Sequence, residues 1–166
     1  MMQHLARAAF TLGVYLALFT SPRATLAMPQ QGDAALNSRG DHVMGFSQDK
    51  TTHHFELTKT GGIIQVRVKV PADSAIRDHI RMHLQHISKA FAEGDFEDPM
   101  EVHAEVPPGV PAMKKLKDKI AYRYESIASG GRVVIRTDNA DALEAVHNYL
   151  QYQIRQHKTG DSLEVR

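Results

Sequence analysis

The sequence predicts an α+β fold, a two-layer sandwich in which two long helices cover one face of an antiparallel sheet of four or five strands. Two observations support this prediction. Apolar residues alternate with polar ones in two pairs of short segments, each pair joined by a glycine-containing turn. A long segment with apolar residues at helical spacing follows each pair. We therefore expect a single domain over residues 51–161, built from two ββα halves, residues 51–95 and 119–161.

The first half begins with alternation over residues 53–58, followed by the predicted turn Lys59-Thr60-Gly61-Gly62 and renewed alternation over residues 64–70. Apolar residues then recur every three or four positions over residues 76–91, which predicts a helix with one apolar stripe. Gly94 follows at the position where a glycine commonly ends a helix.

The second half repeats this plan. Strands are predicted over residues 120–127 and 132–137, with a turn at residues 128–131 between them, and an apolar stripe runs over residues 143–154. Gly130-Gly131 follows Gly61-Gly62 at an offset of 69 residues, and two further matches, Leu150-Gln151 with Leu84-Gln85 and Gly160-Asp161 with Gly94-Asp95, occur at an offset of 66. The two offsets differ by three residues, and the difference lies in the connection from strand to helix, where an insertion is easily tolerated. We therefore interpret the halves as an internal duplication.

Between the halves, residues 100–106 alternate in a way that predicts a fifth strand at the edge of the sheet, and residues 111–118 a short helix. On such a strand Glu101, His103 and Glu105 share one face. Two carboxylates and an imidazole can hold a divalent ion. They are equally typical of a solvent-facing edge strand.

Residues 1–27 have the order of a secretory signal peptide. Arg7 precedes an apolar run over residues 8–20, and Thr25-Leu26-Ala27 provides small residues for cleavage after Ala27. The run is too short to span a bilayer as a helix, and no later segment is apolar enough. We expect an exported protein, periplasmic or secreted, with residues 28–50 as a flexible arm because they are polar and aperiodic.

Composition excludes several classes of function. Hydrophobic residues make up 42% and charged residues 23% of the chain, as in an ordinary globular protein. Removal of Arg7 and Arg23 with the signal changes the formal charge from +1 to −1, which argues against a nucleic-acid or anionic-membrane binder. The chain has no cysteine, so disulfides and thiolate metal sites are excluded.

Histidine is the unusual residue, with ten in the chain. On the first long helix His79, His83 and His86 fall within a sector about 60° wide that flanks the apolar stripe. Imidazoles one turn apart can chelate copper, zinc or nickel, and methionines nearby in the sequence, such as Met82, favour Cu(I). We therefore predict a transition-metal site at these three residues, with three solvated histidines as the other interpretation.

Four more histidines are weaker candidates for metal ligands. His157 falls inside the apolar stripe of the second long helix, and His147 lies at its edge. His54 shares the polar face of the first strand with Glu56, and His103 lies on the expected fifth strand.

No sequence motif indicates catalysis, because nucleophile elbows, phosphate loops and zinc-protease motifs are all absent. A non-enzymatic protein is therefore favoured. The alternative to a metal binder is an interaction module that engages another envelope protein without a metal. The sequence does not indicate an oligomeric state.

Four short segments resemble a family of small exported bacterial proteins without an established activity, and the resemblance covers residues 44–161. The segments are Lys50-Thr51-Thr52-His53-His54-Phe55, Gly94-Asp95-Phe96, Pro107-Pro108-Gly109 and His157-Lys158-Thr159-Gly160-Asp161. Some relatives carry the label aspartate carbamoyltransferase, but this chain lacks the Ser-Thr-Arg-Thr phosphate loop of that enzyme. The resemblance implies an exported setting and assigns no functional residue.

The exported protein is predicted to begin at Met28, because signal peptidases cleave after a small residue such as Ala27. N-terminal sequencing of the protein recovered from outside the cytoplasm tests this. An N-terminus that still contains Arg7 would contradict the signal peptide.

Overall fold

The computed structural model describes residues 31–166 and confirms the α+β class. The predicted signal peptide, residues 1–27, and the predicted N-terminal Met28 lie outside the described residues. In chain order the elements are α1 (Gln31–Met44), η1 (Gln48–Lys50), β1 (Thr51–Thr58), β2 (Gly61–Val68), α2 (Ser74–Glu93), α3 (Glu97–His103), α4 (Val110–Lys115), η2 (Lys117–Lys119), β3 (Ala121–Ile127), β4 (Gly130–Arg136) and α5 (Ala140–His157). Within this part of the chain, no helix combines the length and the apolar character that a bilayer crossing requires.

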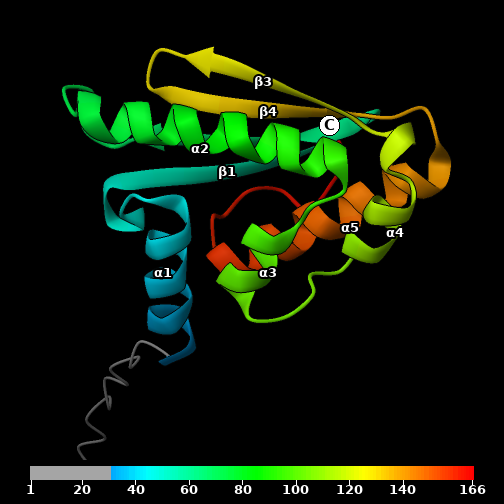
Figure 1. Ribbon diagram of the computed structural model, residues 1–166, viewed down its shortest axis with the longest axis horizontal. Helices are drawn as coiled ribbons and strands as arrows, with labels where there is room; N and C mark the ends of the chain where they lie inside the picture. Colours follow the sequence, from blue (N-terminus) through cyan, green and yellow to red (C-terminus); the bar gives the residue numbers. More distant parts are fainter. Residues whose placement is uncertain (1–30) are drawn as a thin grey trace, which may run out of the picture.

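The four strands form one antiparallel sheet in the order β1-β2-β4-β3 (Figure 1). The register between the two central strands is symmetric. Gly61 pairs with Arg136 and Arg67 pairs with Gly130, while Ile64 pairs with Val133, its own counterpart at the offset of 69 residues. The two hairpins are therefore related by an approximate twofold axis through the middle of the sheet, as a duplicated ββα unit predicts.

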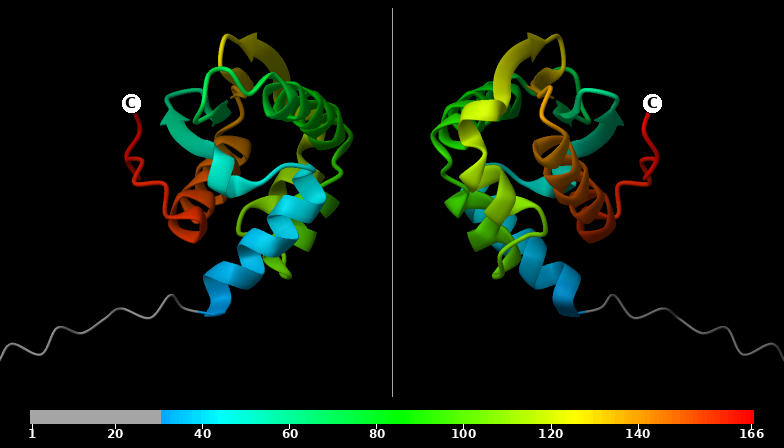
Figure 2. Two further views of the ribbon diagram at one scale, coloured as in Figure 1. Left: turned by 90° about the vertical axis from the view of Figure 1, so that its left-hand side faces the viewer. Right: turned by 90° about the vertical axis from the view of Figure 1, so that its right-hand side faces the viewer.

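Each long helix covers the hairpin of the other half. Helix α2 follows β2 in the chain but packs mainly on β3 and β4, and α5 follows β4 but packs on β1 and β2. A side chain on Gly131 would meet Leu84 of α2, and one on Gly62 would meet Leu150 of α5. Because Gly62 and Gly131 belong to the same face of the sheet, both helices lie on one side of it (Figure 2). Neither half can therefore bury its own hairpin without the other.

The predicted apolar stripes form the core. Ile80, Leu84 and Phe91 of α2 are buried, as are Val146 and Leu150 of α5. The helix ends follow local rules: the side chains of Asp73 and Asn139 accept hydrogen bonds from the first turns of α2 and α5, and Gly94 ends α2 with a positive φ.

The glycine pairs occupy equivalent positions, but they begin the second strand of each hairpin instead of forming its turn. The turns are Lys59-Thr60 and Ala128-Ser129. Glycine is needed at these strand starts because the backbone of the neighbouring strand comes too close to leave room for a Cβ atom. A Cβ on Gly61 would lie 2.1 Å from the carbonyl oxygen of Ile135, and one on Gly130 would lie 2.2 Å from that of Val66.

The predicted fifth strand over residues 100–106 is wrong, because residues 97–103 form α3. Pro99 and Val102 are both buried, at a spacing that suits a helix, and Glu97 and Asp98 lie in the first turn, where the helix dipole favours acidic residues. The predicted short helix over residues 111–118 is present as α4 followed by η2.

The C-terminal segment, not a fifth strand, covers the free edge of β1 (Figure 2). The backbone N–H of Phe55 donates to the carboxylate of Asp161, and the N–H of Arg166 donates to the carbonyl oxygen of Leu57. These bonds satisfy part of an edge that would otherwise be open to another strand.

Residues 31–44 form α1, where the sequence predicted an arm without regular structure. Leu36 and Phe46 are buried, and the guanidinium Nε of Arg39 donates to the carbonyl oxygen of Val102 at the end of α3. The helix therefore depends on tertiary contacts, which an aperiodic sequence does not reveal.

Gly130→Ala is expected to lower the free energy of unfolding by at least about 2 kcal/mol, because the new Cβ meets the backbone of β2. Gly160→Ala is the matched control, since Gly160 has a positive φ but open space around it, and should cost only about 1 kcal/mol. Urea unfolding of both variants tests this. Equal losses of unfolding free energy in the two variants would show that the close approach of the backbone to Gly130 does not destabilise Gly130→Ala.

Candidate functional site

A small pocket lies between the sheet and the helices, at the end of the molecule where β1 begins. Its volume is about 70 Å³. Four histidines from four different elements line it, His53 of β1, His83 of α2, His103 of α3 and His157 of α5. The rest of the lining is mostly apolar, and Met44 of α1 contributes to it. The fold thus gathers imidazoles that are far apart in the sequence.

The four imidazoles and Phe46 form a continuous row of rings. From His83, the centroid distances are 5.8 Å to Phe46, 6.4 Å on to His53, 5.7 Å to His157 and 5.2 Å to His103. The rings of His53 and His157 are nearly parallel, with 10° between their planes. Phe46 thereby contacts both His83 and His53.

Burial keeps these imidazoles neutral. Burial, with a smaller contribution from neighbouring His83, lowers the pKa of His53 to about 4. Burial likewise lowers the pKa of His83 to about 4 and that of His157 to about 3, and it lowers the pKa of His103. At neutral pH each ring therefore offers a nitrogen lone pair, which is the form that binds metals or accepts hydrogen bonds.

Two of these ring nitrogens are buried without a hydrogen-bond partner, Nε2 of His53 and Nδ1 of His103. His103 Nε2 lies 3.0 Å from the amide oxygen Oε1 of Gln153, to which it donates. This bond sets the tautomer and leaves the lone pair of His103 on Nδ1. A buried polar nitrogen without a partner is costly, so both nitrogens call for an explanation.

The approximate twofold symmetry allows the pocket histidines to be compared with the residues at the equivalent positions of the other half. At the offsets of the duplication, His53 corresponds to Tyr122 and His157 to Phe91. Tyr122 and Phe91 also contact each other, with centroids 5.7 Å apart, and Phe91 stacks on Phe96 to form an ordinary aromatic core. The equivalent positions are thus occupied by phenylalanine and tyrosine at one end of the molecule and by two histidines at the other.

The three histidines predicted as a metal site on α2, His79, His83 and His86, do not all point the same way. His79 and His86 are exposed, and His86 Nε2 lies 3.5 Å from a carboxylate oxygen of Asp98. Only His83 turns inward and lines the pocket. Within residues 31–166, no set of three or more histidine, aspartate or glutamate side chains is already arranged to hold a metal ion.

The weaker candidates separate in the same way. His103 and His157 line the pocket. His147 instead donates through Nε2 towards the carbonyl oxygens of Thr58 and Gly61, and His54 pairs with Asp161 beyond the pocket.

The face predicted for Glu101, His103 and Glu105 does not exist, because residues 97–103 are helical. His103 is buried, Glu101 is exposed, and Glu105 accepts a hydrogen bond from the hydroxyl of Tyr152.

His53 is the pocket residue that the choice of candidates missed. It occupies the apolar side of the alternation on β1, together with Phe55 and Leu57. An ionisable residue at a core position of a strand is a signal that the sequence contains. Nothing in the sequence indicates that Gln153 accepts a hydrogen bond from His103.

Comparisons of the chain with protein-family models, with curated proteins and with solved structures gave no match.

Acidification is expected to destabilise the protein through these buried rings. Between pH 6.5 and about pH 4 the unfolded chain takes up protons that the buried histidines do not, so stability falls as the pH falls through this window. His157→Phe, which copies Phe91, should reduce the loss between pH 7.5 and pH 5 by about 2 kcal/mol. Urea unfolding at both pH values measures it. His79→Phe, at an exposed ring, serves as the control, and equal losses in the wild type and His157→Phe would contradict the explanation.

Proposed function

We propose that this protein is an exported binder of a single transition-metal ion, copper or otherwise zinc or nickel, with His53, His103 and His157 as its ligands. The helix histidines first predicted as the site contribute only His83 to the surroundings of this ion. The three ligands come from β1, α3 and α5, so the site depends on the complete fold. No reaction is assigned to it.

The observation that carries the proposal is the replacement of an aromatic pair by an imidazole pair at symmetry-related positions. Phe91 and Tyr122 show that the fold fills the equivalent place with benzene-ring side chains, although the Tyr122 hydroxyl is also buried without a hydrogen-bond partner. A buried imidazole nitrogen without a partner destabilises the protein, and His53 Nε2 and His103 Nδ1 are two such nitrogens. A bound ion supplies those partners.

The size and chemistry of the pocket favour an ion over an organic ligand. Its volume of about 70 Å³ is well below the roughly 300–1,000 Å³ typical of pockets for organic ligands. Neutral imidazole is a preferred ligand of copper, zinc and nickel, and the thioether of Met44 in the lining shifts the preference towards copper.

The hydrogen bond from His103 to Gln153 has the form expected around a metal site. A ligating histidine commonly donates its other ring N–H to an oxygen, which holds the ring and its tautomer in place. Binding requires His53 and His157 to leave their parallel stack, because the three nitrogens must converge to about 2.0–2.1 Å from the ion. A change of side-chain rotamers is therefore part of the proposal.

The second candidate is the interaction module without a metal. Its support is the other face of the sheet, which no helix within residues 31–166 covers. Ile63 and Val134 pair at the centre of that face and are only half-buried, with Arg67 and Arg132 close by. Charged groups surround this small apolar area, and nothing there identifies a partner.

Calorimetric titration with Cu²⁺ and Zn²⁺ tests the metal proposal on the untagged protein. The wild type is expected to bind one ion tightly. His53→Phe/His157→Phe, which replaces both imidazoles with rings that carry no ligand atom, should weaken that binding by at least about 100-fold. Thermal unfolding checks that the variant is folded.

His54→Gln is the matched control, because His54 neighbours His53 in the chain but lies outside the pocket. It should bind as the wild type does. Unchanged affinity and stoichiometry in the double variant would overturn the proposed function and leave the interaction module as the better interpretation.

A further inference from the structure

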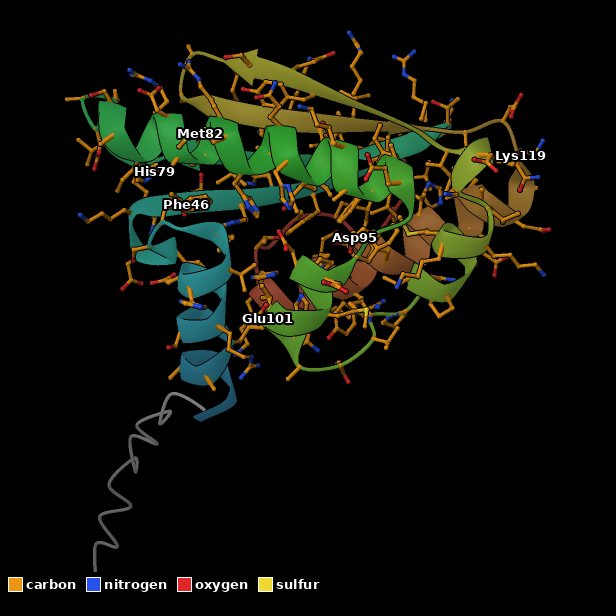
Figure 3. The ribbon with its side chains drawn as sticks, viewed as in Figure 1. Phe46, His79, Met82, Asp95, Glu101 and Lys119 are labelled. Atoms are coloured by element: carbon orange, nitrogen blue, oxygen red, sulfur yellow. The ribbon has the colours of Figure 1, made fainter. Side chains whose placement is uncertain are left out.

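A second hollow adjoins the histidine pocket on the outside of the molecule. It has a volume of about 410 Å³ and lies between the end of α1, the outer face of α2 and the beginning of α3. His79, Met82 and His86 line it from α2, Met44 from α1 and Asp98 from α3. Figure 3 shows His79 and Met82 on the part of α2 nearest to α1, with Phe46 below them.

The side chains of this hollow are chemically unusual for a surface. Met82 is 59% exposed, and it lies between two exposed imidazoles on the same helix. Thioethers together with imidazoles are ligands that favour Cu⁺. Asp98, which is near His86, adds a carboxylate that attracts a cation.

The hollow and the pocket share part of their lining. Both are lined by Met44, His83 and Asp98. His83 contacts Phe46 edge to face, and Phe46 in turn stacks on His53, so rings in contact connect a residue of the outer hollow with the inner ligands.

We propose that the outer hollow is a second, weaker Cu⁺ site through which the ion is loaded into the pocket, with His79, Met82 and His86 as its first ligands. This inference rests on the proposed function of the inner pocket. The ion then passes to Met44 and His83, which face both spaces, and from there to His53, His103 and His157.

The physical reason for an outer site is dehydration. The inner pocket is small and mostly apolar, so an ion cannot enter with its hydration shell. Ligands along the route replace water molecules one at a time, and the local concentration of the cation near the opening rises. Such pre-concentration accelerates association by roughly 10-fold or more. Loading should therefore depend on the outer residues although the final affinity does not.

The test follows transfer of Cu⁺ from its coloured complex with bicinchoninate to the untagged protein without oxygen. The equilibrium gives stoichiometry and affinity, and the time course gives the loading rate. His79→Ala/Met82→Ala/His86→Ala removes the outer ligands. Gln85→Ala/Lys89→Ala, at two other exposed positions of α2, is the matched control.

The wild type and the control are expected to take up one tightly bound and one weakly bound Cu⁺. The outer triple variant should keep the tight ion with unchanged affinity, lose the weak ion and load about 10-fold more slowly. His53→Phe/His157→Phe should keep only the weak ion.

Other outcomes separate the two proposals. If the outer variant matches the wild type in rate and stoichiometry while the inner variant loses the tight ion, the loading site is wrong and the inner site stands. If the outer variant loses the tight ion, the outer hollow is itself the main site, and both the loading role and the inner site are wrong. If the inner variant keeps the tight ion, the proposed function fails.

Discussion

The pairing of β2 with β4 is the interaction on which the rest of this structure depends. It joins the two hairpins about an approximate twofold axis at Ile64 and Val133, and it allows each long helix to cover the hairpin of the other half. The close contacts at Gly61 and Gly130 occur along this seam. Because each half buries the apolar face of the other, the two must fold together, and the ends of the molecule become symmetry-related places.

The two ends differ in chemistry and in how the equivalent rings pack, because Phe91 and Tyr122 meet edge to face whereas His53 and His157 are stacked. Around Phe91 and Tyr122 the rings form a stable aromatic core. Around His53 and His157 the stacked imidazoles bring polar nitrogens into an apolar setting, where burial lowers their pKa values. The metal proposal explains what the chain gains from burying imidazoles at this end.

The helix α1 contributes both to the histidine pocket and to the outer hollow next to it. Its last residue, Met44, lines both the pocket and the outer hollow, and Phe46, which follows the helix, belongs to the row of rings. Arg39 fixes it to the end of α3, the helix that carries His103. The segment predicted to be an unstructured arm thus completes the candidate site.

The sequence by itself determined the hairpins, the two long helices, their end signals and the repeated ββα order, because alternation, helical spacing and capping depend only on neighbouring residues. It also identified histidine as the unusual residue. The tertiary structure alone decided which histidines meet. The rotation of α2 turns His83 inward and His79 outward, and the exchange of helices between the halves carries His157 to His53. These placements follow from packing between distant segments, which no local pattern encodes.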